Sequence, residues 1–125
     1  MSDIVRERLL LILESLDLIQ ERMVSVREAQ DFVSTSSGVV IMDSIALRLQ
    51  TIGENVKKIE RVEPELLAHF SEVNWNRVIR FRDMISHHYE KTDYEILFNI
   101  CTGHLAPLRK VIVRMLESTT DSNAQ

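Results

Sequence analysis

Near the start of the chain, apolar residues recur at alternating steps of four and three. This first apolar line comprises Val5, Leu9, Ile12, Leu16, Ile19 and Met23. Such steps place side chains on one face of an α-helix, so a helix is predicted from about Asp3 to the mid-twenties. A second line comprises Ile4, Leu11 and Leu18, and the stripe is widened by Leu10 and Leu13. A helix this broadly apolar needs partners on more than one side, either other helices or a second copy of the chain.

A second long helix is predicted after the polar stretch Ser34-Thr35-Ser36-Ser37-Gly38. Small polar residues of this kind are typical of helix caps and chain breaks. The apolar line of this helix comprises Ile45, Leu49, Ile52, Val56 and Ile59. Gly53 lies inside the helix, where glycine costs about 1 kcal/mol relative to alanine. Close approach of another backbone at Gly53 would explain its presence there.

Two further helices are predicted in the middle of the chain. Pro64 fits the first turn of a short helix that carries Leu66, Leu67 and Phe70. Residues 71–74 read as a connector, and the next helix is expected from Trp75 to about His88. Thr92-Asp93-Tyr94-Glu95 then has the pattern of a capping box, in which the Thr caps a helix and the Glu reaches back.

The last helix carries one apolar line and one proline. The line comprises Leu97, Cys101, His104, Leu108, Val111 and Met115. Because His104 falls on this apolar line, it is predicted to be a hydrogen-bonded histidine in the core. Pro107 lacks a backbone N–H and should kink the helix near Gly103.

The pattern as a whole predicts an all-α fold. There is no strand-like alternation and no internal repeat. We expect an antiparallel bundle of four to five helices in one domain, residues 1–117, followed by a frayed polar tail, residues 118–125.

Composition narrows the class of protein. With 125 residues, the chain is long enough for one domain with a real core. The net charge of -4 argues against a general nucleic-acid coat, although a local positive patch would still allow RNA binding. The lone Cys101 excludes an intrachain disulfide and fits a reducing compartment. No apolar run reaches about 18 residues and no signal peptide is evident, so we expect a cytoplasmic protein that does not enter a membrane.

Chemistry concentrates in residues 80–89. Arg82, His87 and Tyr89 bring a permanent cation, a titratable base and a phenol onto one helical segment. Cleavage of RNA without a metal needs a base for the ribose 2′-hydroxyl and a cation for the charge that develops on the phosphate. Histidine suits the first task and arginine the second. Arg77 and Arg80 lie about one turn away and could guide the RNA backbone.

Helix geometry raises a difficulty for a site within one chain. At 100° per residue, His87 lies about 140° around the helix axis from Arg82, whereas Ser86 and Tyr89 share the Arg82 face. A straight helix would not direct both the Arg and the His at one small ligand. Either the helix loosens near His87, or two chains each contribute part of a site at a two-fold interface.

Each of these residues also has an ordinary structural interpretation. An Arg on a helix is usually solvated or ion-paired. Asp83 could pair with His87 one turn later, and Tyr89 could be a core edge with its hydroxyl in water. Trp75 could serve the core alone.

The surrounding chain resembles the HepT-type branch of the HEPN superfamily of ribonuclease toxins. The resemblance covers about residues 1–117 and rests on five elements. They are Arg82-x4-His87-x-Tyr89, the Gly53-Glu54 pair, Trp75 seven residues before the motif Arg, the segment from Asp93 to Leu97, and the Pro107-Leu108 step.

The resemblance implies a homodimeric all-α toxin whose partner is a minimal nucleotidyltransferase antitoxin. Family members of this type cleave RNA without metal at the dimer interface, which assigns catalysis to Arg82 and His87. The motif Tyr, here Tyr89, can be adenylylated by the antitoxin, and the added phosphate and bulk would silence the toxin. ATP would be the antitoxin's substrate, so no cofactor of this chain is implied. tRNA as the RNA substrate is a family-level expectation.

The chain departs from the family pattern in places. The position after the motif Arg is often Asn and is Asp83 here, a carboxylate that could orient His87 but also repels phosphate. His88 adds a second candidate base. Glu54 matches an acidic position of the family, and its role could be structural.

Two other functions stay open. One is a catalytically silent helical dimer that binds a nucleotidyltransferase or a nucleotide. The other is a metal-binding bundle that uses His69, His87, His88 and His104, but no Glu or Asp lies three residues before any of them, as a di-iron bundle would require. The antitoxin role itself does not fit, because the chain has no Asp-x-Asp pair and no predicted strand.

Overall fold

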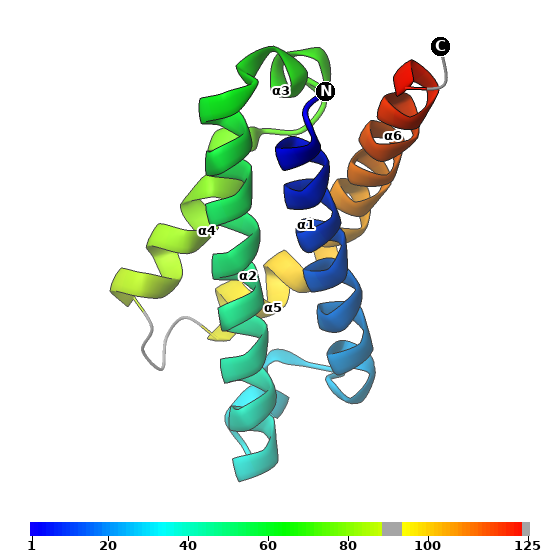
Figure 1. The fold of residues 1–125 in the computed structure, drawn as a ribbon. Helices are drawn as coiled ribbons and strands as arrows, with labels where there is room; N and C mark the ends of the chain where they lie inside the picture. The colour runs from blue at the N-terminus through cyan, green and yellow to red at the C-terminus, as the bar shows by residue number, and fades with distance from the viewer. Residues whose placement is uncertain (89–93, 124–125) are drawn as a thin grey trace.

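The computed structural model describes the backbone of residues 1–88 and 94–123 and the side chains of residues 1–82 and 94–118. Over this part of the chain the structure is built from α-helices and two short 3-10 helices, with no strand (Figure 1). The elements are α1 (Asp3–Arg22), η1 (Met23–Ser25), η2 (Ala29–Phe32), α2 (Ser36–Val62), α3 (Pro64–His69), α4 (Trp75–His88), α5 (Tyr94–Gly103) and α6 (Leu105–Asn123). The predicted all-α fold is confirmed.

The long helix α2 forms the middle of the bundle. It packs along α1 on one side and along α4 on the other, and α1 in turn packs against α6 (Figure 1). The first apolar line of α1, apart from the half-buried Met23 at its end, and the apolar line of α2 lie in the core. The fully or almost fully buried members are Val5, Leu9, Ile12, Leu16 and Ile19 of α1 and Ile45, Leu49, Ile52, Val56 and Ile59 of α2. Burial of these lines supplies most of the driving force that pairs the helices.

The second apolar line of α1 is covered only in part. Ile4 and Leu10 expose 55% and 47% of their surface, while Leu11 and Leu18 are half-buried. The other described helices therefore do not cover the whole apolar surface of α1.

Side-chain caps fix where the two longest helices begin. The Ser2 hydroxyl accepts a hydrogen bond from the Val5 N–H at 3.2 Å, and the Thr35 hydroxyl accepts one from the Gly38 N–H at 3.0 Å. Both caps satisfy N–H groups that a first helical turn leaves without partners. Gly38 itself is obligatory by contact, because a Cβ there would collide with the Asp31 carbonyl oxygen.

The short helix η2 was not predicted from the sequence. The Asp31 carboxylate accepts hydrogen bonds from the Arg27 N–H at 2.8 Å and the Glu28 N–H at 3.2 Å, and these bonds lower the pKa of Asp31. The turn holds Phe32 in the core, where its side chain is fully buried. Phe32 therefore anchors the connection between α1 and α2.

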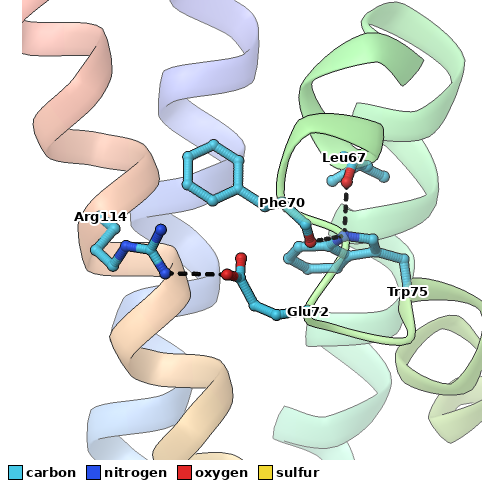
Figure 2. A network of polar contacts seen from close by, with 5 residues as sticks. All are labelled: Leu67, Phe70, Glu72, Trp75 and Arg114. Carbon is cyan, nitrogen blue, oxygen red and sulfur yellow. Dashed lines mark hydrogen bonds and ion pairs between the residues drawn. The ribbon is translucent and has the colours of Figure 1, made fainter.

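The start of α4, the helix that carries the residues of interest, is fixed by Trp75. The indole N–H donates to two carbonyl oxygens at the end of α3, Leu67 at 2.9 Å and Phe70 at 3.0 Å (Figure 2). These bonds give partners to carbonyl groups that have no hydrogen-bond donor at the end of the short helix α3. Asn74 caps α4, because its Oδ1 accepts a hydrogen bond from the Arg77 N–H at 3.1 Å.

The predicted kink near Gly103 is confirmed as a complete break. The chain divides into α5 and α6, which meet at an angle of 48°. Pro107 has no N–H to donate to the carbonyl of Gly103, four residues earlier, so the helix cannot continue without interruption.

The prediction that His104 belongs to the core is wrong. His104 lies at the break and its side chain is exposed. The predicted apolar line assumes one continuous helix. The break removes His104 from that line, while Leu108 stays buried.

The structure does not test several of the sequence predictions. Thr92 and Asp93 of the predicted capping box lie outside the described residues. Helix α6 continues to Asn123, so the proposed boundary after residue 117 stays a prediction. Within the ranges described, no single helix has the length and apolar character to span a membrane, and only the bent pair α5–α6 taken together meets those criteria.

Candidate functional site

Helices α2 and α4 approach each other closely at Gly53. A Cβ on Gly53 would lie 3.0 Å from the Ile79 carbonyl oxygen, 3.1 Å from the Arg82 Cβ and 3.2 Å from the Arg82 nitrogen. These are backbone atoms and a Cβ, which cannot move aside as the end of a long side chain could. Gly53 therefore sets how near α4 comes to α2, which confirms the close approach predicted from the sequence.

Arg82 is thus placed at the α2–α4 junction. Its backbone faces Gly53, and its side chain is half-buried. The Arg82 side chain accordingly starts from a fixed point on the helix pair and is partly exposed to solvent.

Glu54 lies beside Gly53 on α2 and is half-buried. Its Oε1 accepts a long hydrogen bond, 3.5 Å, from the Gln50 Nε2 one turn earlier on the same helix. This contact is local to α2, so the geometry gives Glu54 a structural partner and leaves its functional role a prediction.

The other members of the predicted motif cannot be placed by their side chains. Asp83, His87 and His88 belong to the described backbone of α4, but their side chains lie outside the described part of the structure. Tyr89 lies outside the described residues altogether. The assignment of catalysis to His87 and of modification to Tyr89 stays a prediction.

Arg77 and Arg80 are both exposed on α4. Arg77 does not join Arg82, because the five-residue step turns it by about 140° around the helix axis. It lies instead on the side of α4 that faces the junction of α5 and α6.

A groove of about 240 Å³ lies between this side of α4 and the α5–α6 break. Arg77 and Phe81 line one wall, and Gly103 and His104 line the other. His104 was not predicted to be a surface residue. Gly103 and Pro107 nevertheless predicted an interruption of the helix around His104, and such an interruption would remove His104 from the buried line.

Cys101 of α5 is half-buried and lines a second pocket, which α1 and α6 also border. Burial raises the pKa of the Cys101 thiol to about 12, so the thiolate needed for nucleophilic chemistry does not form near neutral pH. Among the residues whose positions are described, no group of three or more His, Cys, Asp or Glu side chains is arranged to hold a metal ion.

Comparison with known protein families shows a match over most of the chain. The family model described as "Ribonuclease HepT-like" matches residues 12–115. The matched range includes Gly53 and Glu54 of α2, all of α4 and the α5–α6 break. No solved structure matches the chain significantly.

Proposed function

The chain belongs to the HepT-like ribonuclease family, and we propose that it is a toxin that cleaves RNA without a metal ion, at a site formed where two copies of the chain meet. The placement of Arg82 is the observation that carries this proposal furthest. The tight packing at Gly53 holds the Arg82 backbone against α2, and the side chain remains partly exposed. An arginine whose backbone is fixed and whose side chain is partly exposed is suited to contact a phosphate group that approaches from outside the bundle.

The proposed reaction divides the work between two residues. His87 removes the proton from a ribose 2′-hydroxyl, and the 2′-oxygen attacks the adjacent phosphorus. Arg82 stabilises the negative charge on the phosphate oxygens. The 5′-oxygen of the next nucleotide leaves and takes up a proton, so the products are a 2′,3′-cyclic phosphate end and a 5′-hydroxyl end.

A second copy of the chain is proposed because the geometry of a regular helix separates Arg82 from His87 within one copy. Arg82 and His87 are separated by about 140° around α4 if the helix is regular. On α2, moreover, Val40 and Leu47 expose 65% and 59% of their surface. They are seven residues apart, which places them on one face, and the same step leads to Glu54 beside Gly53. A two-fold partner that covers Val40 and Leu47 and continues along the same face of α2 would reach Glu54, the neighbour of Gly53.

The test of this function is RNA cleavage by the unmodified protein in excess EDTA. Mass spectrometry first confirms that Tyr89 carries no adduct. We expect the rate in EDTA to equal that in Mg²⁺, with 2′,3′-cyclic phosphate ends on the products. Activity that disappears in EDTA and returns with a divalent metal would contradict the metal-free mechanism. Absence of cleavage in both buffers would favour the silent helical dimer.

Gly53→Ala tests whether the α2–α4 spacing sets the position of Arg82. The new methyl group would force α4 away by a few tenths of an ångström. We expect the cleavage rate to fall on the order of tenfold, because small displacements of a catalytic group are costly. The free energy of unfolding should fall by only about 1–2 kcal/mol, since a gain in helix propensity offsets part of the overpacking.

The matched stability control for this variant is Gly103→Ala. A Cβ at Gly103 meets nothing within 4 Å, so this glycine at the end of α5 should accept the substitution without loss of stability. Urea unfolding curves are compared between the two variants, and the cleavage rate of Gly53→Ala is compared with that of the wild type. Wild-type cleavage by the Gly53→Ala protein would show that Arg82 does not depend on the close approach.

Regulation by a minimal nucleotidyltransferase antitoxin is proposed at Tyr89. We expect co-expression with the cognate antitoxin to add one or more adenylyl masses to the peptide that contains Tyr89. The negative phosphate would then occupy a site built for the phosphate of RNA. A Tyr89→Phe chain should remain unmodified, and an adduct located on another residue would rule out this assignment.

A further inference from the structure

The groove between α4 and the α5–α6 break has a charge pattern that the proposed catalytic site does not use. Its two walls come from segments far apart in the sequence, and each wall contributes an exposed, cationic or titratable side chain. Arg77 projects from α4, and His104 from the break. Neither side chain forms an ion pair with any side chain that the structure describes.

The acidic residue in the groove lining, Glu72, already pairs with an arginine. Glu72 borders the groove, and its Oε2 lies 3.3 Å from Arg114 Nη1 of α6 (Figure 2). Arg114 is also held over the Phe70 ring, with 5.4 Å between the guanidinium carbon and the ring centroid. Because Glu72 is paired with a positioned cation, the local balance of the groove favours an anion even though the whole chain is negative.

The wall of the groove is open at Gly103. A Cβ there would meet no atom within 4 Å among the described residues of neighbouring elements, so a larger side chain has room at this position. Arg80, exposed one turn after Arg77 on α4, continues the line of cations from the groove along the motif helix. An anionic polymer lying along this line would run parallel to the helix that carries Arg82.

We infer that this groove is a binding subsite for the phosphodiester backbone of the RNA substrate, with Arg77 and His104 as its ligands. The inference rests on the proposed ribonuclease function and adds to it a path for the strand outside the catalytic site. Contacts of this kind give affinity without sequence preference, and each neutralised phosphate adds to the salt dependence of binding.

The test is binding of a 2′-O-methyl RNA oligonucleotide, which lacks the nucleophile and cannot be cleaved. We expect Arg77→Ala and His104→Ala each to raise the dissociation constant about tenfold. The Arg77→Ala variant should also flatten the dependence of log Kd on log salt by about one unit. Matched controls are Arg61→Ala and His69→Ala, which remove an exposed Arg and an exposed His elsewhere.

A steric variant tests the groove without changing charge. Gly103→Leu should fill the open space beside Gly103 and weaken binding to a similar extent, with a wild-type unfolding curve. Its control is Thr102→Leu, which adds a leucine at the adjacent exposed position outside the groove lining.

Equal Kd values for the groove variants and their controls would overturn the subsite, as would absence of oligonucleotide binding by the wild type. Binding of AMP as tightly as the oligonucleotide would identify a mononucleotide site and would also overturn it. Failure of the wild type to cleave unmodified RNA would instead contradict the proposed function, so the two failures are distinguishable.

Discussion

Arg82→Ala is expected to lower the rate of RNA cleavage by about 10²–10³-fold or more, the usual cost of removing one group that stabilises charge in a transition state. The fold should survive, because alanine keeps the nitrogen and Cβ that face Gly53. The measurement is a single-turnover cleavage rate in EDTA, accompanied by helix content from circular dichroism and by the mass of the assembly in solution.

The control for Arg82→Ala is Arg61→Ala, which removes an exposed Arg from the last turn of α2. Both variants change the net charge equally, so a general electrostatic effect on RNA would appear in both. If Arg82→Ala lost helix content along with activity, Arg82 would be a structural residue and the assignment of catalysis would fail.

Mixing two inactive chains is expected to restore activity if the site is shared between copies. His87→Ala alone should be as defective as Arg82→Ala alone. In a heterodimer of the two variants, one of the two sites combines Arg82 from one chain with His87 from the other. Random exchange makes half of the dimers hetero-dimers, so about one quarter of the wild-type activity should return.

This complementation separates the two geometries that the sequence left open. If α4 loosens near His87 and one chain supplies both residues, every site in the mixture lacks one of them and no activity returns. The mixture is unfolded and refolded together so that subunits exchange, and each variant treated alone in the same way serves as the reference.

Helical periodicity predicted the core well wherever a helix runs without interruption. The line through Ile45, Leu49 and Ile52 is buried as expected, because burial repeats with the helix turn. The same reasoning failed at His104, where a break that Pro107 imposes ends the register. Phe32 was missed for a different reason, because a single apolar residue in a 3-10 turn has no period to detect.

For the candidate site, the sequence predicted the kind of chemistry and one packing relation. Gly53 stood out because glycine is costly inside a helix, and the structure pairs it with Ile79 and Arg82. Which backbone would approach Gly53 could not be derived, since that depends on how the helices pair in three dimensions. The groove at His104 was likewise beyond a linear pattern, because its walls are some 25 residues apart in the sequence.

The protonated state of Cys101 has a practical consequence for measuring the proposed assembly. A thiol with a pKa of about 12 reacts slowly with maleimide and methanethiosulfonate reagents near neutral pH. We therefore expect Cys101 to contribute little during brief labelling near neutral pH. A single cysteine introduced at Lys58, which is exposed on α2, would carry a spin label selectively. Distances between two such labels would then report the geometry of a pair of chains directly in solution.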